Sequence, residues 1–506
     1  MKDSKKLIIG FAFLKFLIHF IVVVSGGYGI FRDELYYLAC AEHPATGFVD
    51  QPPLSTLFLG LITSVFDDSL FVIRLFPALI GTSTVFLVGK ITERMGGSLF
   101  AITLACLAYI ISPINLGFGT FYSMNVYDLF FWSMTYYLII QLIQTRDKKW
   151  WIWIGVVLGL SLLNKLSTIW LGIGLLVGIL LTPSRKWLIT LWPYYSAAIA
   201  LLIFSPFIIW NMTHNWAHLE FIDNATSGKY SGLNAWSFIS GQFLINSPNN
   251  FLIWVTGLGF IFFSNKLKEY RLLGWIFAST FIILVLNGNS KSEYLAASMP
   301  ILYASGGIAL ESWKWLGEKL VLKGVIITFL ALGLFFIPLA VPLLPQQQFI
   351  SYSNWLGISK SNDEGHEEKE LPQFYADMHG WEEQVAAIAE AYHSLDVDEK
   401  KNTYLFGSNY GKAGAIDYYA DEYDLPKSIG NHNSYWIWGY RDYDGGTLIL
   451  LSSNPDGLKE LFHSVEKYAD YGCSYCMSYE DVLGIYICRD LKKPVEEFWK
   501  ELKNYH

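Results

Sequence analysis

Charged side chains are scarce in this chain. Only 16% of its 506 residues are Asp, Glu, Lys or Arg, whereas soluble domains carry about a quarter. The net charge is −8 and there is no dense basic stripe, which argues against a nucleic-acid-binding protein. Hydrophobic residues instead make up 53% of the chain, and aromatic residues 17%. This composition predicts a membrane protein in which many Trp and Tyr side chains lie at the two membrane surfaces.

Cysteine is also rare, with five residues in the whole chain. Cys40 and Cys106 lie in or near the apolar part, whereas Cys473, Cys476 and Cys488 lie in the C-terminal tail. The spacing Cys473-x-x-Cys476 is typical of a zinc half-site, a redox pair or a structural disulfide. A zinc site requires a second pair of this kind, and the sequence contains none. We therefore favour a structural disulfide or simple burial.

The apolar residues are concentrated in long runs. A membrane-spanning helix needs about 20 such residues, and the first run, residues 7–24, has no small-residue cleavage site after it. It is predicted to be an uncleaved first span. A shorter run, residues 54–66, is predicted to lie along the membrane surface. About eleven spans are predicted, at residues 7–24, 70–89, 98–115, 124–144, 150–164, 166–182, 187–210, 250–264, 272–287, 294–311 and 324–344.

The basic residues indicate how these spans are oriented. With eleven spans, every cluster of Lys and Arg falls on the same side of the membrane, which the positive-inside rule identifies as cytoplasmic. The clusters are Lys2/Lys5/Lys6, Lys90/Arg94, Arg146/Lys148/Lys149, Arg185/Lys186, Lys266/Lys268/Arg271 and Lys314/Lys318/Lys323. We therefore expect a multi-pass protein of the plasma (inner) membrane with a cytoplasmic N-terminus. Residues 25–69, residues 211–249 and everything after residue 345 are expected on the outer face.

The tail differs in composition from the rest of the chain. Residues 346–370 are predicted to be a linker, and residues 371–506 to be a second domain. Helical segments at 382–393 and 456–468 alternate with strand-like segments at 403–406, 447–451 and 484–488, which predicts a small α/β domain. The fold expected overall is a polytopic all-α membrane domain, residues 1–345, followed by this small extracytoplasmic α/β domain.

Two further segments of the tail have a distinctive composition. Residues 407–415 are rich in glycine and follow a predicted strand, but they fit neither the P-loop nor the dinucleotide-binding fingerprint. Residues 431–438 combine aromatic and polar side chains. Such a composition suits stacking on sugar rings, and a packed loop explains it nearly as well.

Asp33 and Glu34 are the leading candidates for chemistry. They follow the first span, in a long outer loop beside Arg32, Tyr36 and Tyr37. Ionisable groups at the edge of a membrane domain are costly and usually mark a functional site. A carboxylate held near a reacting hydroxyl would serve as a general base. The alternative is a salt bridge with Arg32 inside the loop.

Two basic positions on the outer side are candidates for binding an anion. Lys165 lies between two apolar spans, and Lys291 precedes Tyr294 at a membrane edge where positive charges are few. A lipid phosphate would lie at this depth. The alternative for Lys165 is a side chain that only extends towards the membrane surface. The alternative for Lys291 and Tyr294 is a pair that only contacts lipid headgroups.

Asn125, Asp128 and two histidines complete the candidates. Asn125 and Asp128 are three residues apart near the start of a predicted helix, so they share a face. They are equally suited to a binding site and to a helix cap. His214 and His218 have a spacing that would place both on one helical face, as in many zinc sites, although packing or substrate contact explains them as well.

The combination of motifs is more specific than any one of them. Arg32-Asp33-Glu34-Leu35-Tyr36-Tyr37, Asp50-Gln51-Pro52-Pro53-Leu54, Leu163-Asn164-Lys165 and Lys291-x-x-Tyr294 together resemble glycosyltransferase family 39. The similarity is to the bacterial branch related to dolichyl-phosphate-mannose protein mannosyltransferases and aminoarabinose lipid A transferases. It covers roughly residues 1–345. The tail also resembles the extracytoplasmic extension of some bacterial members.

This resemblance implies a GT-C fold and an inverting transfer from a polyprenyl-phosphate-linked sugar to an extracytoplasmic acceptor: protein, lipid A or a cell-envelope glycan. Asp33 would be the catalytic base with Glu34 beside it. The donor phosphate would contact the basic and phenolic residues Lys165, Lys291, Tyr294 and Arg32. The substrate would contact Asn125, Asp128, His214 and Tyr36.

The cofactor and the function are not settled by the resemblance. It identifies no cofactor with certainty, and a divalent metal ion and its ligands are left undetermined. Membrane lipids are expected as partners, and nucleic acid is not. The alternative function is a membrane transporter or flippase of a lipid-linked or small polar substrate. Two features count against it, because the ionisable residues gather at one face instead of the midplane and no internal repeat is evident.

Overall fold

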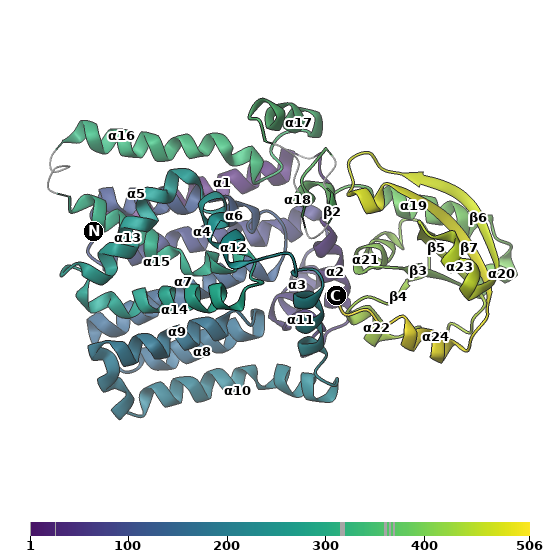
Figure 1. Cartoon of the computed structure of the whole chain (residues 1–506), viewed down its shortest axis with the longest axis horizontal. Helices are drawn as coiled ribbons and strands as arrows, with labels where there is room; N and C mark the ends of the chain where they lie inside the picture. Colours follow the sequence, from purple (N-terminus) through teal and green to yellow (C-terminus); the bar gives the residue numbers. More distant parts are fainter. Residues whose placement is uncertain (1, 26, 314–318, 359–361, 364–365, 368–369) are drawn as a thin grey trace.

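The structure, a computed structural model, describes residues 2–25, 27–313, 319–358, 362–363, 366–367 and 370–506. A bundle of long helices forms one end of an elongated molecule, and a smaller domain of helices and strands forms the other (Figure 1). The N-terminus lies at the far end of the bundle, whereas the C-terminus returns to the junction between the two parts (Figure 1). The predicted fold class, an all-α membrane domain followed by a small α/β domain, is confirmed.

Among its described residues, the helical bundle includes five short 3-10 helices, labelled η. The elements of this region are α1 (Lys2–Ser25), α2 (Arg32–Glu42), α3 (Leu54–Val65), α4 (Leu70–Arg94), α5 (Leu99–Ile110), α6 (Pro113–Gly117), α7 (Met124–Thr145), α8 (Trp150–Asn164), α9 (Thr168–Leu181), η1 (Pro183–Ile189), α10 (Trp192–Thr213), α11 (Ala217–Ser227), α12 (Ala235–Ile245), η2 (Pro248–Asn250), α13 (Phe251–Phe263), η3 (Lys268–Tyr270), α14 (Arg271–Asn287), η4 (Ser292–Ser298), α15 (Pro300–Glu311), α16 (Leu320–Ala331) and η5 (Leu332–Leu339).

Several of these helices are long enough to cross a membrane. Among the described residues, six meet the length and hydropathy expected of a span: Lys2–Ser25, Leu70–Arg94, Met124–Thr145, Trp192–Thr213, Lys268–Asn287 and Leu320–Leu339. A seventh results if Thr168–Leu181 and Pro183–Ile189, which bend by 105°, count together. The other predicted spans correspond to shorter apolar helices, so the count of eleven stays a prediction. The predicted surface segment 54–66 forms the short helix α3.

Small residues allow neighbouring helices of the bundle to approach closely. A Cβ atom at Gly155 of α8 would lie 2.6 Å from the backbone oxygen of Ser196 in α10. Likewise, a Cβ at Gly306 of α15 would clash with the backbone oxygen of Ile253 in α13. Membrane helices associate through such small-residue contacts, because the hydrophobic effect gives little drive between helices surrounded by lipid.

The C-terminal region begins with helices and continues as a mixed sheet. Its elements are α17 (Gln346–Trp355), β1 (Asn362–Asp363), β2 (His366–Glu367), α18 (Gln373–Ala376), α19 (Trp381–Ser394), α20 (Val397–Lys401), β3 (Thr403–Gly407), α21 (Tyr410–Tyr419), β4 (Ile429–Gly430), α22 (Ser434–Trp438), β5 (Thr447–Ser452), α23 (Pro455–Leu461), β6 (Phe462–Gly472), η6 (Ser478–Glu480), β7 (Val482–Leu491) and α24 (Val495–Glu501). The predicted linker thus contains a helix, α17, and part of its charged stretch lies outside the described residues.

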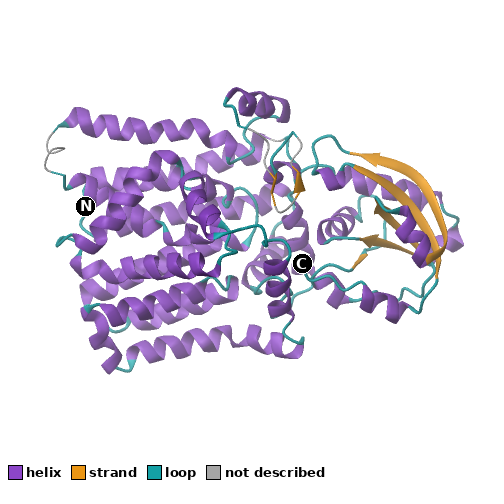
Figure 2. Cartoon of the chain, viewed as in Figure 1, coloured by secondary structure: helices purple, strands orange, loops and turns teal. Residues whose placement is uncertain are grey.

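The five-stranded sheet has the order β4-β3-β5-β7-β6, and its strands are orange in Figure 2. β3 is parallel to β4 and β5, whereas β7 is antiparallel to β5 and β6. Alternate side chains of a strand face opposite sides, and β5 shows this: Ile449 and Leu451 belong to the hydrophobic cluster with α19 and α21, and Leu448 and Leu450 to the cluster with α23 and α24. The sheet is therefore covered on both faces.

One predicted element of this domain is wrong. A helix was expected over 456–468, but α23 ends at Leu461 and the chain continues as β6. β6 pairs with β7 from Phe462↔Leu491 to Gly472↔Val482. The apolar strand β7 offers a long row of backbone hydrogen-bonding groups, and pairing with that row outweighs the weak local preference of 462–472 for a helix.

The C-terminal domain is joined to the bundle through α2. The backbone N–H of Gly29 donates to Met378 O at 3.0 Å, and that of Arg32 donates to Asp377 O at 3.0 Å. α21 lies against the same helix, because a Cβ at Gly414 would be 3.0 Å from Leu35. The segment that follows α1, in which α2 carries the two candidate carboxylates, is therefore enclosed by both parts of the molecule.

Candidate active site at the domain junction

The two adjacent carboxylates of α2 have different environments. Glu34 is fully buried. Its oxygens accept hydrogen bonds from Arg74 Nη2 at 2.8 Å, from the Phe31 backbone N–H at 2.9 Å and from the Tyr122 backbone N–H at 2.8 Å. A buried charge requires such pairing. Glu34 therefore ties α2 to α4 and to the segment before α7, and its oxygens face these partners.

Asp33 faces a different direction, because successive residues of a helix are rotated by about 100°. Its side chain is 37% exposed. The Tyr410 hydroxyl, from the C-terminal domain, donates to Asp33 Oδ1 at 2.9 Å. Asp33 is thus open to solvent and is also oriented by a residue 377 positions away in the sequence.

Arg32 is directed towards the C-terminal domain. Its Nη1 donates to the Tyr479 hydroxyl at 2.6 Å, and its Nη2 lies 3.6 Å from Asp377 Oδ2. The guanidinium also lies over the Tyr410 ring, 5.4 Å from the centroid. The distance from Arg32 Nε to Asp33 Oδ1 is 3.9 Å, so the ion pair inside the loop exists but is long. The main contacts of Arg32 thus join the two domains.

Asp50 is a second carboxylate of this region, and Tyr36 holds it in place. The Tyr36 hydroxyl lies 2.8 Å from both Asp50 Oδ1 and Ser434 Oγ. Burial raises the pKa of Asp50 to about 7, against the opposing effect of the Tyr36 hydrogen bond, and the nearby charge of Asp33 also raises it. The motif around Asp50 is visible in the sequence, but the sequence alone does not indicate a role for the Asp50 carboxylate. A perturbed carboxyl beside an exposed one is typical of acid–base sites.

Lys229 is another residue that the sequence analysis missed. Burial raises the pKa of Asp50 and lowers that of His432; the positive charge of Lys229 opposes the first shift slightly and adds slightly to the second, so Lys229 lies within electrostatic range of both groups. The sequence signal was a lone lysine in the outer loop 211–249, where basic residues are few. Lys229 Nζ lies 6.0 Å from the centroid of the Tyr230 ring, and Lys291 Nζ lies 5.1 Å from the same centroid.

Four residues selected from the sequence meet in a second cluster. Lys165 Nζ donates to Asn125 Oδ1 at 2.6 Å and lies 4.0 Å from Asp128 Oδ2. The same ammonium group lies 5.6 Å from the centroid of the Tyr294 ring. Asp128 also accepts from the Ser167 hydroxyl at 2.8 Å. The structure therefore brings Asn125, Asp128, Lys165 and Tyr294 together.

The carboxylate region and the lysine cluster are connected through the start of α7. The Met124 backbone N–H donates to the Tyr37 hydroxyl of α2 at 3.0 Å, and Asn164 Nδ2 donates to Met124 O at 2.9 Å. Lys165 directly follows Asn164. Elsewhere in the site, the ammonium groups of Lys291 and Lys229 both lie near the Tyr230 ring. The start of α7 thus links α2 to the residue that precedes Lys165.

The two histidines do not share a helical face, so their predicted pairing is wrong. The chain turns between them, because Asn215 and Trp216 have φ angles of 52° and 58°. His214 Nδ1 lies 2.8 Å from the backbone oxygen of Trp210, and the His214 ring stacks on the Trp210 ring. His218 Nδ1 lies 2.8 Å from Val49 O, and burial lowers the pKa of His218 to about 4. His218 thus supports the loop that carries Asp50, whereas His214 packs against its own helix.

Metal ligation was left undetermined by the sequence. Within the part of the chain that the structure describes, no three His, Cys, Asp or Glu side chains are grouped around a common metal position. Asp33 and Asp50 alone do not form such a group.

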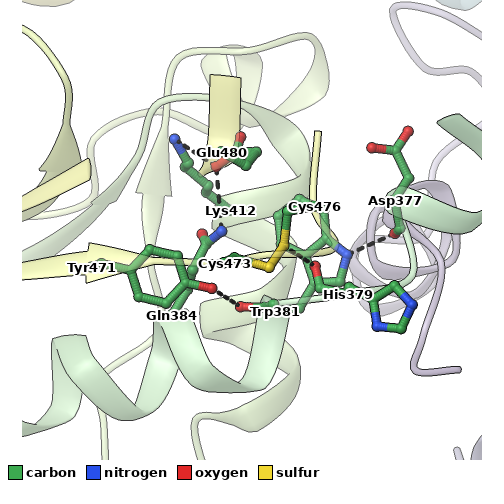
Figure 3. Close-up of a disulfide and its surroundings, with 10 residues drawn as sticks. Asp377, His379, Trp381, Gln384, Lys412, Tyr471, Cys473, Cys476 and Glu480 are labelled. Carbon is green, nitrogen blue, oxygen red and sulfur yellow. Dashed lines mark hydrogen bonds and ion pairs between the residues drawn. A yellow bond between two sulfur atoms is a disulfide. The ribbon is translucent and has the colours of Figure 1, made fainter. Parts of the chain in front are cut away.

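A disulfide lies close to the junction (Figure 3). Cys473 and Cys476 are bonded, with their Cα atoms 5.6 Å apart, so the expected structural disulfide is present. The segment that follows it carries Glu480, which accepts from Asn409 Nδ2 at 3.1 Å and pairs with Lys412 Nζ at 3.1 Å. Asn409 caps the N-terminus of α21, the helix that begins with Tyr410. The disulfide therefore lies beside the segment that supports Tyr410.

Comparison with known proteins identifies relatives of this fold. Residues 50–210 match the family model described as dolichyl-phosphate-mannose-protein mannosyltransferase. The crystal structure of ArnT from Cupriavidus metallidurans bound to undecaprenyl phosphate matches with a TM-score of 0.59 and 13% identity, over 94% of this chain and 97% of that one. The apo structure of the same ArnT matches with a TM-score of 0.60, 13% identity and the same coverage.

This chain has the GT-C glycosyltransferase fold. The fold implied by the four sequence motifs is thereby confirmed, and two of those motifs, Asp50–Leu54 and Leu163–Lys165, lie within the residues that match the family model. At 13% identity the structural match establishes the architecture alone. No curated protein sequence matches the chain. The roles of individual residues therefore depend on the geometry described above.

Proposed function

We propose that the protein is an integral membrane glycosyltransferase that moves a sugar from a polyprenyl-phosphate donor to a hydroxyl of an extracytoplasmic acceptor. The GT-C fold and the family match over residues 50–210 support this class of reaction. The ArnT structure with undecaprenyl phosphate supports a polyprenyl phosphate as the lipid. Acceptors consistent with this chemistry are a protein, lipid A or a cell-envelope glycan.

The observation that carries the proposal is the position of Asp33. It is a partly exposed carboxylate that both domains enclose, because α2 supplies it and Tyr410 of the C-terminal domain orients it. Its neighbour Glu34 is fully engaged by Arg74 and by backbone donors. In this proposal Asp33 is the base, and Glu34 is a positioning residue that fixes the start of α2.

The proposed reaction is a single displacement at the anomeric carbon. The Asp33 carboxylate accepts the proton of the acceptor hydroxyl, and the acceptor oxygen forms a bond to the anomeric carbon. The bond from that carbon to the phosphate oxygen breaks, and its electron pair leaves with the polyprenyl phosphate. Attack and departure on opposite sides of the carbon invert its configuration, so the transfer is proposed to be inverting.

The departing phosphate requires positive charge and hydrogen-bond donors. We assign this role to Lys165, Lys291 and Tyr294, with Lys229 as an additional cation. Lys165 is held by Asn125 and Asp128, which position its ammonium group. Arg32, which the sequence placed in the same group, is engaged by the C-terminal domain, and we propose that it holds the domains together around Asp33.

Tyr36 and Asp50 are proposed to contact the acceptor side of the reaction. Their connection to Ser434 places a C-terminal segment, residues 431–438, next to the proposed base. This arrangement would allow the C-terminal domain to take part in choosing the acceptor. His214 packs against Trp210 and has no role in the proposal beyond shaping this loop.

The proposed topology follows from the reaction. A donor with a long isoprenoid chain lies in the membrane, and its phosphate lies at the surface where the lysine cluster is found. We therefore propose a plasma (inner) membrane protein with a cytoplasmic N-terminus and an extracytoplasmic C-terminal domain. The positive-inside pattern of the basic clusters supports this orientation.

Transfer by the purified full-length protein tests the function. Radiolabelled undecaprenyl-phosphate sugars are supplied in turn with membrane acceptors, and both the released lipid phosphate and the labelled acceptor are measured. Asp33→Asn is expected to lower the transfer rate by about 100-fold to 10,000-fold, because general-base catalysis contributes a factor of this size. Glu42→Gln is the matched control, since Glu42 lies on the same helix and pairs with Lys427 at the surface.

Two results would contradict the proposal. If Asp33→Asn transferred sugar at the wild-type rate, Asp33 would not be the base. If neither the wild type nor Asp33→Asn turned over any donor, while both moved the intact lipid across a bilayer, the protein would be a transporter of the lipid-linked substrate.

A further inference from the structure

A large cavity lies at the end of the bundle remote from the C-terminal domain. Its volume is ≈ 1190 Å³, and it is lined by the ends of α7, α8, α9, α13 and α14 together with η1 and η3. α7 begins beside α2 at Met124 and ends at Thr145, so a rise of 1.5 Å per residue places the cavity about 30 Å from the proposed active site. The proposed transfer reaction uses no residue of this cavity.

The lining of the cavity is strongly basic. Among the described residues that line it there are five cations and one acid, Glu269. The cations are Arg146, Lys148, Lys186, Lys268 and Arg271. None of the five belongs to an ion pair with any residue that the structure describes. Positive charges gathered around one concave surface create a strong potential for an anion.

Arg271 provides a second and independent observation. Its Nε atom is buried, yet within the described ranges of the chain it has no hydrogen-bond acceptor. A buried guanidinium N–H without a partner is costly, and native proteins rarely leave such a donor unsatisfied. The atom lies on a residue that lines the cavity, so an acceptor bound in the cavity would satisfy it.

The remaining lining is apolar and partly open at the bundle surface. Leu181 and Phe263 are 58% and 87% exposed, respectively. Deeper in the wall, Trp151 packs edge-to-face against Trp187. These apolar groups would add nothing to the binding free energy of a small soluble anion. A molecule with a phosphate headgroup and a hydrocarbon chain would use the cations and the apolar rim together.

We propose that this cavity binds an anionic phospholipid, with the headgroup phosphate among the five cations and an acyl chain along the rim at Leu181 and Phe263. Basic pockets between membrane helices are known to hold such headgroups. The proposed topology places the cavity in the cytoplasmic leaflet, where anionic lipids are abundant. The positive-inside rule alone explains basic loops, but it explains neither their convergence on a cavity nor the orphan donor of Arg271.

A pair of charge-matched variants tests this proposal. The cavity variant carries Lys148→Gln, Lys186→Gln and Lys268→Gln, three exposed residues that line the cavity. The control variant carries Lys149→Gln, Arg185→Gln and Lys266→Gln, which come from the same three connections between long helices, are also exposed and do not line the cavity. Both variants lose the same net charge, and neither touches a buried side chain, so both are expected to fold.

Binding is measured on the purified full-length protein in detergent by native mass spectrometry, with titrations of phosphatidylglycerol and of phosphatidylcholine. The cavity variant is expected to weaken binding of phosphatidylglycerol by about tenfold or more, whereas the control variant should change it by less than about twofold. Phosphatidylcholine should bind weakly to the wild type and to both variants. Transfer activity at the junction is measured in parallel and is expected to survive in both.

Three outcomes would overturn the proposal. Equal weakening in the two variants would show that surface charge attracts the lipid without a specific site. Unchanged binding in the cavity variant would show that the lipid binds elsewhere. Displacement of phosphatidylglycerol by inorganic phosphate alone would identify a site for a soluble anion, for which the apolar rim has no role.

Discussion

The two ends of the helical bundle differ in how their charged side chains are paired. At the domain junction, charged groups are paired across distant parts of the chain: Glu34 with Arg74, and Arg32 with Asp377. At the remote end, five cations surround a cavity and have no ion-pair partner among the described residues. Paired charges fix a geometry, as a site for bond-making needs, whereas unpaired cations leave their attraction available to a mobile anion.

The largest expected effect concerns the buried pair at the junction. Arg74→Met leaves Glu34 buried without its partner, and breaking such a pair typically costs about 3–5 kcal/mol. Lys186→Met at the remote end removes an exposed cation and is expected to change the free energy of unfolding by less than about 0.5 kcal/mol. Denaturant titrations of both variants in mixed micelles measure the difference. Similar losses in the two variants would remove the contrast between the ends.

The next prediction concerns Asp50, whose pKa in the folded protein is about 7. The folded protein holds this proton over a range in which the unfolded chain, with an ordinary pKa of 3.8, has lost it. Stability contributed by Asp50 is therefore greatest at low pH and is lost as the pH rises from about 4 to about 7. His218 and His432, with pKa values lowered to about 4, act in the opposite direction.

Asp50→Asn isolates the contribution of this carboxyl, because the histidines are common to both proteins. We expect the variant to equal the wild type near pH 4 and to be more stable by about 2–4 kcal/mol near pH 8. Unfolding at a series of pH values provides the measurement. A difference between the two proteins that does not vary with pH would show that Asp50 is not held in its protonated form.

The sequence predicted much of this arrangement and missed its connections across the chain. The lysine cluster was predictable, because Asn125, Asp128 and Lys165 are polar residues beside apolar spans, where a membrane protein rarely carries such groups without a functional need. Asp50 was overlooked, because its perturbation arises from burial by segments far away in the sequence. The convergence of α7, α9 and α14 on one basic cavity was also hidden, since the rule that assigns basic loops to one side says nothing about their distance from one another.

Tyr410 shows most clearly what distant contacts add, and it carries the smallest effect we predict. Tyr410→Phe removes the hydrogen bond to Asp33 and keeps the ring that packs against Tyr36. We expect a loss of about 1 kcal/mol in stability and a decrease of about tenfold in kcat, with little change in the KM for the donor, because the base is less well oriented while the phosphate contacts are intact.

Tyr418→Phe is the matched control, since Tyr418 lies on the same helix α21 and also reaches the bundle, where its hydroxyl donates to Asp68 O at 3.2 Å. This variant loses an interdomain hydrogen bond without touching Asp33, so its kcat should stay near the wild-type value. A decrease of kcat in both variants would mean that docking of the C-terminal domain as a whole supports activity. A decrease in Tyr410→Phe alone would show that this domain supplies a positioning residue to the base.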